Sequence, residues 1–158
     1  MSNREYPERP LVGVGGVVIA GDRALLVRRG SEPLCGEWSI PGGLLEAGET
    51  LAEGVVREIR EETGLAVRVV ELIEALERIF PDPAAGAGAP GGAPARPRYH
   101  YVILDYLCER IAGEPQAGGD ITGVVFVREA ELPAYSLSPE TLRVLRKGFA
   151  MARAREAG

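Results

Sequence analysis

The alternation of hydrophobic and polar positions divides the chain into strand-like and helix-like segments. Apolar, β-branched runs at 12–20 and 23–29 flank Gly21-Asp22, a dipeptide that is typical of a tight hairpin turn. Further apolar runs predict strands at 67–80 (one long strand or two bent ones), 99–108 and 121–127. The segment 33–43 is rich in turn residues and contains only a short apolar insertion.

Two segments have the signals of helices. The first follows Thr50, a good N-cap residue, and ends at Gly64, a residue favoured just beyond a helix C-terminus. Its apolar stripe is predicted to be Ala52, Val56, Ile59 and Thr63. The second begins at Ser138-Pro139 and runs to about Arg155. Strands and two helices in one unit predict an α/β or α+β sandwich.

The rest of the chain is divided by composition. Residues 1–10 read as an N-terminal arm, and residues 11–157 as a single domain. Residues 81–97 are too rich in Pro, Gly and Ala to pack a core, so we expect a loop between strands there. The glycine pattern at 86–91 matches G-x-G-x-x-G, but prolines follow where a nucleotide-binding helix would open, so we reject it.

Composition excludes several classes of partner. The chain of 158 residues has 18 Lys and Arg against 23 Asp and Glu, a net charge of -5, which argues against a nucleic-acid partner. No apolar run is long enough for a membrane span, and the first residues are too polar for a signal peptide. Cys35 and Cys108 form neither a disulfide framework nor a zinc motif, so free thiols and a cytoplasmic location are expected.

The first helix contains an unfavourable cluster of charge. Glu58, Glu61 and Glu62 stand at i, i+3 and i+4, where like charges repel on one helix face. Either Arg57 and its neighbours neutralise the three carboxylates on a solvated face, or a cation does. A patch of carboxylates is the oxygen-rich donor set that Mg²⁺ prefers.

The segment around this cluster, GLLEAGETLAEGVVREIREETGL at 43–65, resembles the Nudix box, G-x5-E-x7-R-E-U-x-E-E-x-G-U, where U is apolar. Every specified position matches: Gly43, Glu49, Arg57, Glu58, Ile59, Glu61, Glu62, Gly64 and Leu65. The resemblance implies the Nudix fold, an α/β/α sandwich in which a mixed β-sheet lies between helices. It implies a Nudix pyrophosphohydrolase that cleaves a nucleoside diphosphate linked to another moiety, with Mg²⁺ or Mn²⁺ as cofactor.

The resemblance leaves the substrate open. Pro81 stands 16 residues after Leu65, as in ADP-ribose pyrophosphatases, so ADP-ribose or a similar nucleotide sugar is the first expectation. The alternatives are a MutT-like nucleoside triphosphate pyrophosphatase and a Nudix-like regulator that binds a ligand without catalysis. A small nucleotide is the expected partner, and the choice between monomer and homodimer is open.

The resemblance also implies residue roles. Glu58, Glu61, Glu62 and the Gly42 carbonyl are the expected metal ligands, with Arg57, Glu58 and Glu61 among the catalytic residues. Many relatives carry a further downstream glutamate, but Gly123 stands where it is often found. Asp120, in a Gly-rich loop, is therefore the expected general base, with Glu58 as the alternative. The expected substrate-binding residues are Phe80, Tyr99, Tyr101 and Arg28.

Overall fold

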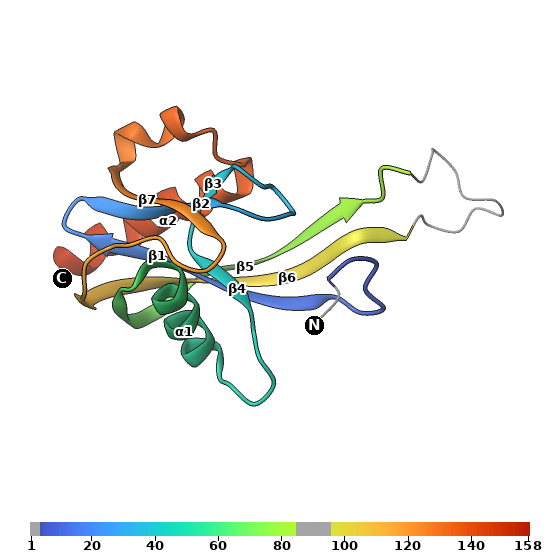
Figure 1. The fold of residues 1–158 in the computed structure, drawn as a ribbon. Coiled ribbons are helices and arrows are strands. Elements are labelled where there is room, and N and C mark those ends of the chain that lie inside the picture. Colours follow the sequence, from blue (N-terminus) through green and yellow to red (C-terminus); the bar gives the residue numbers. More distant parts are fainter. Residues whose placement is uncertain (1–3, 85–95) are drawn as a thin grey trace.

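The structure, a computed structural model, describes residues 4–84 and 96–158, and its centre is a seven-stranded sheet (Figure 1). The strands are β1 (Leu11–Ala20), β2 (Arg23–Arg29), β3 (Trp38–Ser39), β4 (Gly42–Leu44), β5 (Ala66–Pro81), β6 (Pro97–Ala112) and β7 (Ile121–Arg128). Their order is β3-β2-β1-β6-β5, with β4 paired to β1 and β7 paired to β2. Because β1 and β6 run parallel while the other pairs are antiparallel, the sheet is mixed, as expected.

A helix covers each face of this sheet, α1 (Leu51–Thr63) on one side and α2 (Pro139–Glu156) on the other (Figure 1). Successive strand residues point to opposite faces, so adjacent residues join different cores. Val18 and Leu25 pack with Val55 and Ile59 of α1. The residues beside them in sequence, Val17 and Leu26, pack in the second core under α2, with Val144, Leu145 and Phe149. The α/β sandwich predicted from the sequence is confirmed.

The ends of α1 are set by the expected residues. The Thr50 hydroxyl accepts from the amide of Glu53, whose carboxylate accepts from the Thr50 amide, so the two form a capping box. Gly64 ends the helix with φ of 74°, a left-handed conformation that glycine adopts without strain. The predicted apolar stripe was wrong in part. Ala52 is exposed, and the buried positions are Gly54, Val55, Ile59 and Thr63.

The other predicted strands and the second helix are present, and the structure adds short elements that were not predicted. Residues 67–80 belong to one long strand, β5, whose register against β6 shifts at several places. Within 33–43, the short strands β3 and the start of β4 were not foreseen, and neither was the 3-10 helix at Glu129–Tyr135. Most of the predicted loop at 81–97, including the glycine pattern at 86–91, lies outside the described residues.

The N-terminal arm is attached to the sheet. The Tyr6 amide donates to the Arg98 carbonyl at 2.7 Å, and the Glu5 carboxylate accepts hydrogen bonds from the Arg98 guanidinium and the Tyr99 hydroxyl. These contacts hold residues 4–6 beside β6, where the hairpin of β5 and β6 extends beyond the other strands (Figure 1). None of the helices in the described part of the chain is long and apolar enough to cross a membrane.

Candidate active site

Where the glutamates of α1 come closest to β4, the strand has glycines, which carry no side chain. A Cβ added to Gly43 would lie 2.5 Å from an oxygen of Glu58, so only glycine fits there. The Gly42 amide donates to Glu62 Oε1 at 2.6 Å. Gly48 differs, because it has open space around it and instead adopts a positive φ of 90°. The glycines before α1 thus bring β4 directly against two of the three clustered carboxylates.

Burial makes these two carboxylates costly to ionise. Burial raises the pKa of Glu62 to about 7, and the nearby charges of Glu58 and Asp120 add to this effect against the Gly42 amide. The pKa of Glu58 is also raised by burial, although the Arg57 guanidinium opposes the shift. Glu61 is more exposed, at 56% of its side-chain surface. The cluster therefore holds charge that the protein itself does not fully compensate.

Arg57 spreads its guanidinium over four partners. It donates to both oxygens of Glu49, to Glu58 at 2.8 Å and to Glu61 at 3.2 Å, and Nη2 also donates to the Leu44 carbonyl. The hydrogen bonds from Arg57 lower the pKa of Glu49 to about 2. Neutralisation by arginine, one of the two alternatives raised by the sequence, is therefore realised for Glu58 and Glu61. It does not extend to Glu62, which has no ion pair within the described residues.

One cleft of about 250 Å³ brings the predicted metal ligands together. Its lining includes Gly42, Glu58, Glu61, Glu62 and Asp120. Each of these residues can offer an oxygen atom to a metal ion: the four acidic residues a carboxylate oxygen, and Gly42 its carbonyl oxygen. In the described conformation no three acidic, His or Cys side chains of residues 4–84 and 96–158 meet closely enough to hold a metal ion, since Glu58 and Glu61 turn toward Arg57 and Glu62 toward Gly42.

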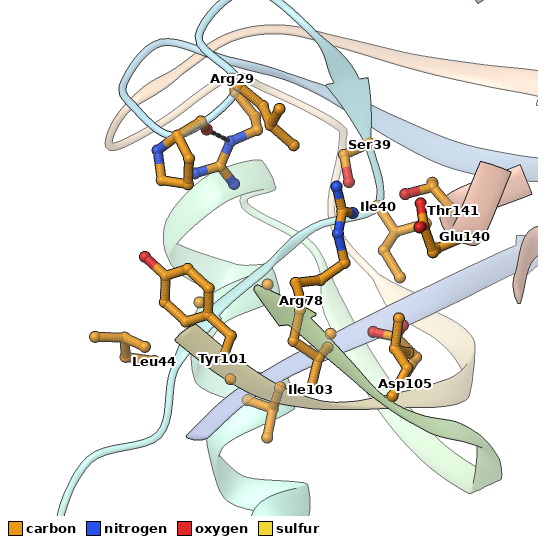
Figure 2. A pocket seen from close by; sticks show the side chains of 18 of the residues that line it. Arg29, Ser39, Ile40, Leu44, Arg78, Tyr101, Ile103, Asp105, Glu140 and Thr141 are labelled. Carbon is orange, nitrogen blue, oxygen red and sulfur yellow. Dashed lines mark hydrogen bonds between the residues drawn. The ribbon is translucent and has the colours of Figure 1, made fainter. Parts of the chain in front are cut away.

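A second cavity, of about 140 Å³, is bordered by Glu140 and Thr141 of α2 (Figure 2). Along β6 its floor is formed by Tyr101, Ile103 and Asp105, and Arg78 projects into it from β5. Apolar groups such as Ile40 and Leu76 complete the walls. The Tyr101 hydroxyl is buried and has no hydrogen-bond partner among the residues that the structure describes. A flat molecule with apolar faces and polar edges fits such a lining.

Four residues line both the cleft and the cavity: Arg4, Arg29, Gly42 and Gly43. Arg29 is fixed by a hydrogen bond from its Nε to the Pro33 carbonyl at 2.8 Å (Figure 2). Arg4 comes from the N-terminal arm. The sequence reasoning missed both arginines. The alternation of side chains along β2 could have indicated Arg29, because it points to the opposite face from Arg28. No pattern in the sequence near Arg4 indicated that it lies at the site.

The structure separates the predicted substrate-binding residues. Phe80 and Tyr101 line the second cavity, but Tyr99 is not part of its lining and packs edge-on against Phe80. Arg28 lines neither space and donates from Nε to the Gly36 carbonyl, because alternate residues of β2 point to opposite faces. Gly123 lies against the ring of Trp38.

Comparisons with known proteins agree with this architecture. A family model described as NUDIX domain matches residues 9–148. The ADP-ribose pyrophosphatase of Methanocaldococcus jannaschii is 32% identical over 133 residues, which are 84% of this chain and 70% of that protein. The 8-oxo-dGTP diphosphatase of Escherichia coli is 30% identical over 105 residues, 66% of this chain and 69% of that protein.

A solved structure is similar over nearly its whole length. The MutT Nudix hydrolase from Burkholderia pseudomallei superposes with a TM-score of 0.71 at 29% identity, covering 89% of this chain and 98% of that one. The match of the family model over most of the chain, together with these relatives and the glutamate-lined cleft behind a complete box, shows that the chain belongs to the Nudix family and is a Nudix pyrophosphohydrolase.

Proposed function

We propose that this enzyme hydrolyses the diphosphate of an adenosine-containing compound of the ADP-ribose type, with a divalent cation, Mg²⁺ or Mn²⁺, in the cleft. One observation carries the proposal: a carboxylate-lined cleft and an apolar, polar-edged cavity share the cationic residues Arg4 and Arg29. A substrate in which a diphosphate joins a nucleoside to a second moiety could place its base in the cavity, its phosphates beside the arginines and its metal-bound oxygens in the cleft. Guanidinium groups bind phosphate oxygens through two parallel hydrogen bonds, which favours them at the junction.

The donor set in the cleft suits a hard divalent cation. Nudix hydrolases generally use a divalent metal. Here Glu58, Glu61, Glu62 and the Gly42 carbonyl would hold it, since all four supply oxygen and together they form an excess of negative charge. When bound, the cation neutralises phosphate charge and lowers the pKa of a coordinated water. Burial raises the pKa of Glu62, and a nearby cation would oppose that rise by favouring the ionised form.

The protein's own groups have separate tasks in this proposal. Arg57 positions Glu58 and Glu61 through its hydrogen bonds and is anchored by Glu49. Asp120, which lines the cleft from the loop before β7, removes the proton from the attacking water. Arg4 and Arg29 bind the phosphate oxygens and hold the diphosphate in line for attack.

The relatives support ADP-ribose first and a nucleoside triphosphate second. The 32% identical relative named ADP-ribose pyrophosphatase spans 84% of this chain, whereas the relative named 8-oxo-dGTP diphosphatase spans 66%. The products distinguish the two activities. AMP and ribose 5-phosphate would support the first, and a nucleoside monophosphate with pyrophosphate would support the MutT-like alternative. A regulator without catalysis is disfavoured because the box glutamates are all present.

A screen with matched variants tests the proposal. The wild-type enzyme is assayed with Mg²⁺ on ADP-ribose, NADH, diadenosine polyphosphates and nucleoside triphosphates. Glu58→Gln is expected to lower kcat on the best substrate by about 100-fold or more, because each 1.36 kcal/mol of lost transition-state stabilisation costs tenfold. Glu77→Gln, an exposed carboxylate of β5 outside both spaces, is the control. Equal rates in the two variants at saturating Mg²⁺ would refute the metal-site assignment.

A further inference from the structure

Asp105 is a buried carboxyl group that the reaction described above does not use. Its residue is 6% exposed, and it lies in the middle of β6, beside Gly15 of β1 and Glu74 of β5. Among the residues of the two described segments, its carboxyl oxygens have no hydrogen-bond or ion-pair partner. Asp105 lines the second cavity, so its unpartnered carboxyl group is open to that space. A polar group placed in this way in a mostly apolar cavity is suited to bind a ligand from the cavity.

Two charged groups near Asp105, Glu74 and Arg78, have partners. Glu74 accepts hydrogen bonds from the Arg143 guanidinium, at 2.5 Å for the shortest. Arg78 donates to the Ser138 hydroxyl at 3.4 Å. Both partners belong to α2 or its N-cap, so α2 provides hydrogen bonds for Glu74 and Arg78 but none for Asp105 among the described residues. Figure 2 places Asp105 at the floor of the cavity, below Glu140 and Thr141.

The sheet makes room for this carboxyl group. A Cβ on Gly15 would lie 2.5 Å from Asp105 Oδ1 and 3.3 Å from the Ile40 side chain, so a larger residue at position 15 would displace the carboxyl or close the cavity. Gly13, one pleat earlier on the same face, also lines the cavity. The glycine spacing at 13–15 therefore opens the floor of the cavity at Asp105.

The chemistry of the cavity restricts what binds there. Leu76, Ile103 and Ile40 provide apolar faces on several sides, which suits the two faces of an aromatic ring. A neutral carboxyl group offers one donor and one acceptor side by side. The edge of adenine that carries N1 and the 6-amino group offers one acceptor and one donor in the complementary order.

We propose that Asp105 recognises an adenine base, donating a hydrogen bond from its O–H to N1 and accepting one from the 6-amino group. The assignment rests on the proposed hydrolysis of an adenosine-containing diphosphate and names the group that selects its base. Burial raises the pKa of Asp105 to about 7, the negative charge of Glu74 adds to this rise and the positive charge of Arg78 opposes it, so the neutral form is available near neutral pH.

Calorimetric binding of AMP and of ribose 5-phosphate to the full chain tests this assignment without any turnover. Asp105→Ala is expected to weaken AMP binding by about tenfold or more, because it removes both hydrogen bonds. Asp105→Asn is expected to bind AMP within about threefold of wild type, since an amide also carries one donor and one acceptor. Ribose 5-phosphate, which lacks a base, is expected to bind all variants equally. Glu77→Gln, on β5 and outside the cavity, is the charge-matched control.

Several results would overturn the assignment. Wild-type affinity for AMP in Asp105→Ala would show that the base does not contact this group. An equal loss for AMP and ribose 5-phosphate would show that Asp105 only maintains the shape of the site. Tighter binding of GMP than AMP by the wild type, with loss of GMP binding in Asp105→Asn, would show that an ionised Asp105 recognises guanine instead of adenine. If AMP binds as expected while ADP-ribose is not hydrolysed, the proposed function fails and the base assignment stands.

Discussion

Arg57 donates to both oxygens of Glu49, from Nε at 2.9 Å and from Nη2 at 2.6 Å. This two-point contact fixes the plane of the guanidinium, so that Nη1 is directed at Glu58 and Glu61. The two residues are separated by eight positions and connect the loop before α1 to the middle of the helix. Glu49 therefore acts on the cleft through Arg57 and is not part of the cleft lining.

The planar guanidinium of Arg57 should not be replaceable by an ammonium group. Arg57→Lys keeps the charge but cannot contact Glu49, Leu44 and Glu58 at once. The carboxylates would then shift, and a misplacement of about 1 Å costs on the order of 100-fold in rate. We expect kcat to fall about 10- to 100-fold with a smaller change in KM. Arg60→Lys, on the exposed side of the same helix, is the control, and similar rates in both variants would contradict the positioning role.

The stability of the metal-free protein should fall as pH rises past the ordinary range of a carboxyl group. The folded state raises the pKa of Glu62 to about 7 from a reference of 4.5, so it binds more protons than the unfolded state between these values. The folded protein is then favoured at pH 4.5 and loses this contribution as pH rises to about 7. Glu62→Gln keeps the acceptor for the Gly42 amide and removes the ionisation.

Denaturant unfolding of wild type and Glu62→Gln in metal-free buffer measures this effect. We expect the variant to gain about 1 to 3 kcal/mol at pH 8, and much less at pH 4.5, because one pKa unit corresponds to about 1.36 kcal/mol. Adding Mg²⁺ at pH 8 should reverse the order, since only the wild type supplies the full carboxylate set. A gain that is the same at both pH values would assign the effect to packing.

The elements of this fold were largely readable from the sequence because their signals are local. Thr50 and Gly64 set the ends of α1 through hydrogen bonds within a few residues, and the turn at Gly21-Asp22 needs only its own positive φ. Glu58, Glu61 and Glu62 lie on a single helix, so their gathering in one cleft followed from spacing alone. The helix stripe was misplaced because tertiary packing, rather than apolar character, decides that Gly54 is buried and Ala52 is exposed.

The remaining parts of the site depend on contacts between distant segments. Arg4 reaches the cleft because Tyr6 and Glu5 bind the start of β6, more than ninety residues away in sequence. Asp105 lies in the cavity because β1 and β6 are parallel neighbours in a particular register, which hydrophobic patterning does not specify. The prediction of Arg28 instead of Arg29 as a substrate-binding residue was wrong for the same reason, because neighbouring residues of a strand point to opposite faces of the sheet.

Arg4 should contribute to substrate binding although it belongs to the N-terminal arm. Its guanidinium borders both the cleft and the cavity and lies close enough to lower the pKa of Glu58. Arg4→Ala is expected to raise KM for the diphosphate substrate about 10-fold, since a charge-assisted hydrogen bond is worth about 1.5–3 kcal/mol, with little change in melting temperature. Arg9→Ala, an exposed arm arginine outside both spaces, is the control. Equal KM values for the two variants would exclude a role for the arm.

Asp120 is the described carboxylate that lines the cleft from outside the box helix. Its Oδ2 accepts a hydrogen bond from the Ser31 hydroxyl at 3.4 Å, a long contact that leaves the carboxylate able to approach a bound substrate. The loop that carries it is held near α1, because the Gly118 amide donates to the Glu62 carbonyl at 2.9 Å. Asp120 therefore reaches the cleft from a different element than the box glutamates.

If Asp120 is the general base, Asp120→Asn should lower kcat about 100- to 10,000-fold, because an amide cannot accept the proton of the attacking water. Metal affinity, measured by Mn²⁺ titration, should stay near the wild-type value. The matched control is Glu114→Gln, since Glu114 lies in the same connection but outside the cleft and pairs with Arg110. A fall of less than about fivefold, or a loss of metal binding that parallels the loss of rate, would transfer the role of base to Glu58.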